Sequence, residues 1–277
     1  MEWNIVKIKD LFIEIVEESG RKIKEIGEHG LKKVEGDNRA NHAILADKVV
    51  SEIVREKLKG FPGIINSEDG KDIDFSGGNP EYLISCDEID GTENLQTGKG
   101  MQPYCTILCA FDSISPKFKD ALVAVIRVHT TGHLFYAIRD KGCYMKEPGK
   151  DFEKLTVTTE KEFTDRLKIR FDSLQARNME MKQIQKLITK AWIKDFGSTG
   201  YHLASLSAGI VDAFVNPGAK GEELGAGYLL IKEAGGSIID FEGNDINDQE
   251  FDQKKEYKII AAATPELAKA ILDEMNS

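Results

Sequence analysis

The 277-residue sequence has few cysteines, no long apolar run and no excess of positive charge. Its cysteines form no Cys-x-x-Cys pair and lie in apolar, strand-like runs, at Cys86, Cys105, Cys109 and Cys143. We therefore expect reduced core thiols and no disulfide framework. The histidines of the HTTGH segment, His129 and His133, have a glycine turn between them and no third ligand nearby, which favours a structural role over zinc binding.

No stretch approaches the roughly 18 consecutive apolar residues that a membrane-spanning helix needs. Glu2, Asp10 and Glu14 interrupt the apolar runs at the N-terminus, which argues against a signal peptide. The sequence has 37 Lys and Arg against 47 Asp and Glu, a formal net charge of −10. This balance disfavours nucleic acid as a partner and favours cations. We expect a cytoplasmic protein that binds neither membrane nor nucleic acid.

The hydrophobic pattern divides the chain into two halves. Apolar residues at spacings of three and four predict helices over 5–26 and 40–58. Short runs rich in Val, Ile and aromatic residues then predict an antiparallel sheet with strands at 63–66, 82–86, 104–111, 121–128 and 133–138. A charged stretch at 146–154 marks a boundary, so we predict an α+β half at 1–148 and an α/β half at 149–277.

In the second half, predicted strands alternate with predicted helices. The strands are expected at 167–171, 191–196, 211–215, 236–241 and 257–262. The helices are expected at 178–190, 200–208, 223–234 and 265–276. This alternation indicates a layered α/β arrangement.

The segment YLISCDEIDGTENL at 82–95 is the most informative for chemistry. An apolar strand runs directly into Asp87, Asp90, Gly91 and Thr92. Two carboxylates at a strand end can share a divalent cation, and the backbone N–H groups of Gly91 and Thr92 can bind a phosphate if they open a helix. A simple turn and helix cap is the alternative. The spacing excludes a haloacid dehalogenase phosphatase, whose second Asp would stand where Ile89 is found.

Two further acidic segments strengthen the metal interpretation. Glu68 and Asp69 follow the apolar run at 63–66, and Glu222 and Glu223 open a segment that ends in EAGG at 233–236. Acidic residues in a first helical turn also interact favourably with the helix dipole, so each segment alone has an ordinary explanation. Their combination with the DxxDGT segment favours a shared metal site.

The segments SEDG, DEIDGTEN, GSTGYHLASLSAGIVDAFVNPG and EELGAGYLLIKEAGG, in this order, resemble the inositol monophosphatase and fructose-1,6-bisphosphatase superfamily, especially its archaeal-type members. The resemblance implies a layered α/β/α/β/α sugar-phosphatase fold and a homodimer. It also implies a Mg²⁺-dependent phosphatase of a small sugar or cyclitol phosphate, with fructose-1,6-bisphosphate and inositol-1-phosphate as leading substrates. The alternatives are a 3′(2′),5′-bisphosphate nucleotidase and a catalytically silent relative that binds a small molecule.

The resemblance further implies roles for individual residues. Asp47 and Thr92 would orient the attacking water, with Glu68 as a third catalytic residue, although Asp47 could also be an exposed helix residue. Two or three Mg²⁺ ions per active site would be held by Glu68, Asp87, the Ile89 carbonyl, Asp90 and Glu223. The substrate would contact Gly91, Thr92, Gly197, Ser198, Thr199 and Asn216.

Three positions depart from the family pattern. Glu222 and Glu223 replace the usual Trp-Asp pair, which leaves open which of them is the metal ligand. Asn216 stands where inositol monophosphatases carry a Glu that contacts an inositol hydroxyl. Glu88 replaces the usual Pro, and we expect its side chain to face out of the loop. Four cations of the second half could reach a second phosphate, although each is more simply a solvated surface residue: Arg170, Arg177, Lys194 and Lys220.

Overall fold

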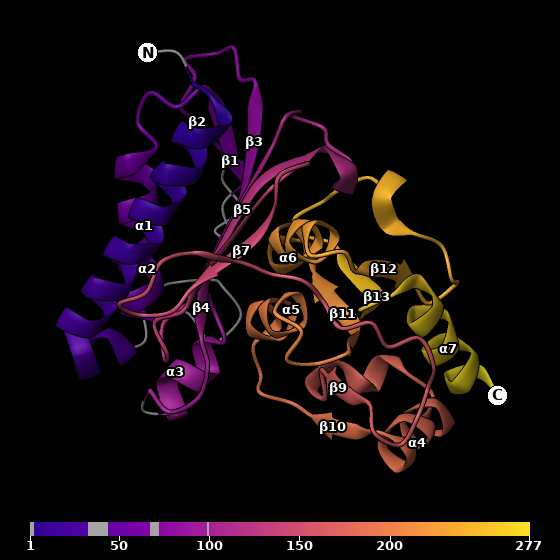
Figure 1. Cartoon of the computed structure of the whole chain (residues 1–277). Helices are drawn as coiled ribbons and strands as arrows, with labels where there is room; N and C mark the ends of the chain where they lie inside the picture. Colours follow the sequence, from indigo (N-terminus) through magenta and orange to yellow (C-terminus); the bar gives the residue numbers. More distant parts are fainter. Residues whose placement is uncertain (1–2, 33–43, 67–71, 99) are drawn as a thin grey trace.

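The computed structural model describes residues 3–32, 44–66, 72–98 and 100–277, which form two sheets and three layers of helices (Figure 1). Helices α1 (Ile5–Ile26) and α2 (Leu45–Lys57) cover one face of the first sheet. Helices α5 (Thr199–Ser207) and α6 (Gly221–Glu233) lie between the two sheets. Helices α4 (Met181–Lys190) and α7 (Pro265–Asn276) cover the far side of the second sheet. The predicted α/β/α/β/α layering is confirmed.

The first sheet has eight strands in the order β2-β1-β3-β4-β5-β6-β7-β8. Their bounds are β1 Gly63–Asn66, β2 Ile73–Asp74, β3 Tyr82–Asp90, β4 Cys105–Phe111, β5 Ala121–Val128, β6 Leu134–Ile138, β7 Gly142–Lys146 and β8 Glu153–Lys154. From β3 to β8 all neighbours are antiparallel, but β1 pairs with β3 in parallel. The prediction of a wholly antiparallel sheet is therefore wrong at this edge, because the connection from β1 to β3 returns the chain to the same end before β3 begins.

The strands in the middle of the first sheet bury both faces. Along β4, Leu108 packs against the layer of α1 and α2, whereas the neighbouring Ile107 packs against the layer of α5 and α6. The apolar runs at these positions follow from this burial on both sides. All four cysteines are buried free thiols, as the sequence predicted.

The second sheet has five strands in the order β10-β9-β11-β13-β12. Their bounds are β9 Lys168–Phe171, β10 Trp192–Lys194, β11 Ala213–Lys220, β12 Ser237–Asp240 and β13 Glu256–Ala262. β11 continues five residues beyond its predicted end, with a register shift between Asn216 and Ala219. Pro217 has no N–H to donate, so an irregularity there is expected. The extension carries the chain directly into α6.

The remaining helical segments are short. They are α3 (Thr92–Gly98) and the 3₁₀ helices η1 (Gly27–Leu31), η2 (Phe118–Asp120), η3 (Leu174–Asn178) and η4 (Ile246–Asp248). Within the described ranges, no helix has both the length and the apolar character that a membrane crossing requires. Strand β8 still pairs with β7 of the first sheet, and the second sheet begins at β9. The division between residues 148 and 149 stays a prediction.

Glu233, the first residue of EAGG, joins α6 to the first sheet. Its two carboxylate oxygens accept the backbone N–H groups of Asp140 and Gly142, each at 2.7 Å. Asp140 lies in the turn between β6 and β7, where it has a φ of 63°, and Gly142 is the first residue of β7. A charged acceptor makes hydrogen bonds of this kind stronger than neutral ones. The contact therefore stabilises both the turn and the position of the helix.

We expect Glu233→Ala to lower the free energy of unfolding by about 2 kcal/mol, because two backbone donors lose a charged acceptor. Urea unfolding followed by circular dichroism measures the change. Glu162→Ala, at an exposed position, is the matched control and should change stability by less than about 0.5 kcal/mol. Equal unfolding midpoints for the two variants would contradict the assigned role of Glu233.

Candidate metal centre and its cavity

A bulge in β3 brings Asp87 and Asp90 to the same side of the first sheet. Asp87 lies opposite Ile107 and Asp90 lies opposite Cys105, so three steps along β3 match two along β4. Directly opposed residues of an antiparallel pair point to the same face, and both partners on β4 face the layer of α5 and α6. In a regular strand, residues three apart would point to opposite faces. The extra residue thus places both carboxylates beside the central helices.

The N-terminus of α5 holds the Asp90 carboxylate. The Ser198 hydroxyl donates to Oδ2 at 2.5 Å, and the backbone N–H groups of Thr199 and Gly200 donate at 3.1 and 2.8 Å. This approach requires glycine at position 200, because a Cβ there would lie 2.9 Å from Oδ2 of Asp90 and 2.6 Å from Cδ1 of Ile107. Burial raises the pKa of Asp90 to about 6, although these donors oppose the shift.

Glu223, in the first turn of α6, completes a cluster of three carboxylates. Asp87, Asp90 and Glu223 each contribute one oxygen, and these oxygens lie within 4.8 Å of one another. Burial and the charge of Asp90 raise the pKa of Glu223 well above its usual value, while Lys220 and a hydrogen bond from Thr199 oppose the shift. Carboxylates this close repel one another unless a proton or cation lies among them. An all-oxygen, all-carboxylate set suits a hard divalent cation such as Mg²⁺.

The neighbouring Glu222 has a different environment. Its side chain is buried, and its Oε1 accepts a hydrogen bond from Lys220 Nζ at 3.1 Å. The cluster of close carboxylate oxygens includes Glu223 and not Glu222. Although Glu is longer than Asp by one C–C bond, the side chain at 223 reaches the aspartates, and this geometry favours Glu223 as the ligand.

The predicted catalytic residues lie on different elements. Thr92 is the first residue of α3, and its hydroxyl donates to the Ile89 carbonyl at 2.8 Å. Asp47 lies in the first turn of α2, where its Oδ2 accepts the Ile44 N–H at 2.7 Å. Its side chain is buried, so the alternative of an exposed helix residue is wrong. The pairing of Asp47 with Thr92 and the metal contact of the Ile89 carbonyl stay predictions, and Glu68 lies outside the described residues.

The residues predicted to contact substrate separate into two groups. Gly91, Thr92, Gly197, Ser198 and Thr199 line a cavity of about 320 Å³ that contains the carboxylate cluster. Their contacts with substrate stay predictions.

Asn216 is fully buried and does not line this cavity in the described part of the chain. Its Nδ2 lies 3.1 Å from Asp172 Oδ2 and 3.4 Å from Thr199 Oγ1, and its Oδ1 accepts the Gly218 N–H at 2.9 Å. The amide is therefore used within the protein, to position Asp172 and the chain before α6. Its contact with substrate also stays a prediction.

The expectation that Glu88 faces out of a loop is wrong. Its side chain is only 2% exposed, and its carbonyl accepts a hydrogen bond from the Thr106 hydroxyl at 2.7 Å. The reason is the bulge, which keeps residue 88 within β3 rather than in a loop after it.

Sequence reasoning missed several residues that shape the cavity. The Asn94 side-chain amide lies 2.7 Å from the Pro103 carbonyl, 2.5 Å from that of Phe196 and 3.2 Å from that of Gly197, and so ties α3 to the loop before α5. Asp172 and Asp195 also line the cavity. Both follow strands directly, after β9 and β10. A carboxylate directly after a strand was the signal that identified Asp87 and Asp90, and the same signal could have identified Asp172 and Asp195.

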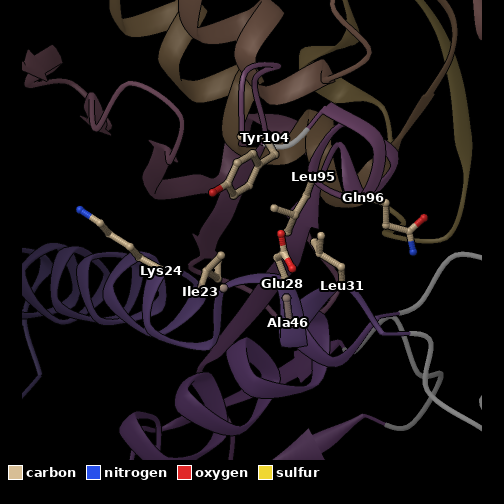
Figure 2. Close-up of a pocket in the computed structure, with 11 residues that line it drawn as sticks. Ile23, Lys24, Glu28, Leu31, Ala46, Leu95, Gln96 and Tyr104 are labelled. Carbon is tan, nitrogen blue, oxygen red and sulfur yellow. The ribbon is translucent and has the colours of Figure 1, made fainter.

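A second and larger cavity, of about 600 Å³, lies between the end of α1, η1 and the region around α3 (Figure 2). Its lining is mostly apolar and includes Ile23, Leu31, Leu95 and Tyr104. None of the three clustered carboxylates lines it. The smaller cavity is therefore the candidate site.

Comparison with known proteins agrees with this geometry. A family model described as the inositol monophosphatase family matches residues 6–277. The chain is 27% identical over 247 residues to the bifunctional NADP phosphatase/NAD kinase of Methanococcus maripaludis, covering 83% of this chain but only 40% of that longer protein. It is 29% identical over 223 residues to the Nus factor SuhB of Xylella fastidiosa, covering 78% of this chain and 74% of that protein.

A further relative is the fructose-1,6-bisphosphatase/inositol-1-monophosphatase of Methanothermobacter thermautotrophicus, 25% identical over 210 residues, with 73% of this chain and 71% of that protein covered. Among solved structures, a Pyrococcus horikoshii protein with similarities to inositol-1 monophosphatase superposes with a TM-score of 0.78 at 24% identity. That superposition covers 98% of this chain and 99% of the other. This structural similarity supports the description of the fold given above.

If Glu223 is a metal ligand, we expect Glu223→Gln to weaken Mg²⁺ binding at least about tenfold, because it removes a negative oxygen donor. Isothermal titration calorimetry near neutral pH measures the dissociation constant. Glu222→Gln is the matched control, and we expect it to change affinity by less than about threefold. A larger loss in Glu222→Gln than in Glu223→Gln would reverse the assignment.

We also expect Mg²⁺ to stabilise the protein more at pH 7.5 than at pH 5. The raised folded pKa of Asp90, about 6 against a usual 3.8, makes its contribution to stability present below pH 3.8 and lost as the pH rises through 6. A bound cation offsets this loss, and binding requires the ionised carboxylate. At pH 5 only about a tenth of Asp90 is ionised. Thermal unfolding with and without MgCl₂, at matched ionic strength, tests this, and equal shifts in Tm at both pH values would contradict it.

Proposed function

The chain belongs to the inositol monophosphatase family, a family of metal-dependent phosphomonoesterases, and we propose that it is a Mg²⁺-dependent phosphatase of a small sugar or cyclitol phosphate. The observation that carries the proposal is the cluster of Asp87, Asp90 and Glu223 inside a cavity of about 320 Å³. That volume suits a small ligand. The similarity to a fructose-1,6-bisphosphatase/inositol-1-monophosphatase makes fructose-1,6-bisphosphate and inositol-1-phosphate the first substrates to test.

In this proposal Asp87, Asp90 and Glu223, with Glu68 and the Ile89 carbonyl, hold two or three Mg²⁺ ions. Bound Mg²⁺ supplies activation of water and neutralisation of phosphate charge. The protein's own part is to keep the ligands in place before the substrate arrives. The donors at the N-terminus of α5 hold Asp90, and the backbone N–H of Lys220 donates to Oε2 of Glu223 at 3.2 Å. Such preorganisation avoids rearrangement during the reaction.

Thr92 and Asp47 are proposed to orient the attacking water. The single hydroxyl hydrogen of Thr92 is directed at the Ile89 carbonyl, so its oxygen retains lone pairs that can accept a hydrogen bond from water. The backbone N–H groups of Gly91 and Thr92 are proposed to bind the phosphate, and Gly197, Ser198 and Thr199 to form the facing wall. In-line attack then needs little covalent chemistry from the protein.

The two alternative functions predict different results in an assay of phosphate release. A bisphosphate nucleotidase would hydrolyse adenosine bisphosphates in preference to sugar phosphates. A catalytically silent relative would bind such ligands without turnover. The homodimer and the cytoplasmic location stay predictions, and sedimentation equilibrium would decide the first of them.

We expect the purified protein to release phosphate in Mg²⁺ from at least one compound in a panel of sugar phosphates, inositol phosphates and adenosine bisphosphates. Removal of the metal with EDTA should abolish the activity. Asp87→Asn should lower kcat at least about a hundredfold, because it removes charge from the centre that stabilises the transition state. Asp165→Asn, at an exposed position that does not line the cavity, is the matched control. Full activity in Asp87→Asn, or no turnover of any compound, would overturn the proposal.

A further inference from the structure

The wall of the cavity remains acidic beyond the carboxylate cluster. Asp172 and Asp195 line it together with the cluster, whereas Lys220 is the one cationic residue among the described residues that line it. Lys220 also lies 3.1 Å from a carboxylate oxygen of Glu222, which balances its charge. Cations bound at Asp87, Asp90 and Glu223 would neutralise those three residues. Asp172 and Asp195 lie outside that cluster and add further carboxylates to the lining of the cavity.

The Asp172 carboxylate is held in one orientation. Its Oδ1 accepts the Gln175 N–H at 3.2 Å, and its Oδ2 accepts a hydrogen bond from Asn216 Nδ2 at 3.1 Å. A carboxylate has about four acceptor positions, so these two bonds leave capacity for a ligand in the cavity. Asn216 thus acts here as a positioning residue for Asp172.

Asp195 is held just as firmly at the rim of the cavity, with its side chain 24% exposed. Its Oδ2 accepts the Ser173 N–H at 2.9 Å and the Ser173 hydroxyl at 2.5 Å. Its Oδ1 accepts the Gly197 N–H at 2.8 Å. Because Ser173 follows Asp172 directly, the hydrogen bonds of Asp195 also fix the backbone next to Asp172. The two acceptors are therefore arranged before a ligand binds.

Four cationic side chains were candidates to bind a second phosphate, but they do not neutralise the negative charge of Asp172 and Asp195. Arg170 is buried, with its guanidinium carbon 4.8 Å from the centre of the Phe196 ring. Arg170, Arg177 and Lys194 do not line the cavity in the part of the chain that the structure describes. Only Lys220 does so, beside Glu222.

We infer that Asp172 and Asp195 select a monophosphate whose remaining part is an uncharged polyol, and that they disfavour a second phosphate. The inference rests on the proposed phosphatase function and names the substrate class of the same site. Hydroxyl groups carry no net charge, and they can donate hydrogen bonds to both carboxylates. A second phosphate would instead face two like charges in a partly enclosed cavity, where screening is weaker than in bulk water.

The test compares substrates that differ only in the second phosphate. We would measure kcat/KM in Mg²⁺ for fructose-1-phosphate and fructose-1,6-bisphosphate, with inositol-1-phosphate as a further monophosphate. Wild-type protein should prefer the monophosphate at least about tenfold. Asp172→Asn should reduce this preference at least about threefold, by improving the bisphosphate reaction and weakening the monophosphate reaction. Asp165→Asn, which makes the same change in net charge away from the cavity, should leave the preference unchanged.

The wild-type protein provides a second readout that does not depend on a variant's folding. Raising the NaCl concentration should increase kcat/KM for the bisphosphate relative to the monophosphate, because salt screens repulsion by Asp172 and Asp195. Asp172→Asn should show a weaker salt dependence, which a merely structural effect of the substitution would not produce.

Two results would overturn the inference while leaving the proposed function intact. The first is equal or better turnover of the bisphosphate by wild-type protein. The second is a substrate preference that Asp172→Asn changes no more than Asp165→Asn does. No phosphate release from any of the three compounds or the wider panel would instead overturn the proposed function, and the inference with it.

Discussion

Asp87, Asp90 and Glu223 bring three carboxylate oxygens within 4.8 Å of one another, and like charges at this distance oppose folding unless they are compensated. The surrounding structure supplies part of the compensation. The N-terminus of α5 directs two backbone N–H groups and the Ser198 hydroxyl at Asp90. These donors do not remove the cost of burial, since the pKa of Asp90 remains raised to about 6. The site therefore suits a cation, whose positive charge would balance the carboxylates that the protein itself does not neutralise.

This constraint explains why α5 and α6 lie between the two sheets. The first turn of each helix must reach the end of β3, since Ser198 caps α5 and Glu223 lies in the first turn of α6. The two helices also pack very closely: a Cβ on Gly227 would lie 2.2 Å from Cδ1 of Leu203. The small residues of the EELGAG segment thus serve the packing that positions Glu223. Glu233, at the other end of α6, fixes the helix to the turn between β6 and β7.

The carboxylates that line the cavity fall into two groups, which differ in the groups that balance their negative charge. At the cluster, three carboxylates converge and suit a metal. Asp172 and Asp195 lie outside that cluster. A backbone N–H and the Asn216 amide orient Asp172, whereas two backbone N–H groups and the Ser173 hydroxyl orient Asp195. In the described residues, the surrounding cations are either paired, as Lys220 is, or directed elsewhere, as Arg170 is. We infer that this difference, rather than the metal centre, distinguishes one phosphate ester from another.

The sequence by itself determined the succession of helices and strands, the strand ending in Asp87 and Asp90, and Glu222 and Glu223 as candidate ligands, because hydrophobic period and motif spacing are local properties. The layering of the whole fold was implied by the family resemblance. It did not reveal the parallel pairing of β1 with β3, the buried position of Glu88 or the place of Asp172 in the cavity lining. Each of these depends on residues far apart in the chain: the bulge exists only against β4, and Asp172 and Asp195 line the same cavity only because β9 lies beside β10. Only the tertiary structure separated Glu223 from Glu222, since adjacent helical residues point in different directions and packing decides which of them faces the aspartates.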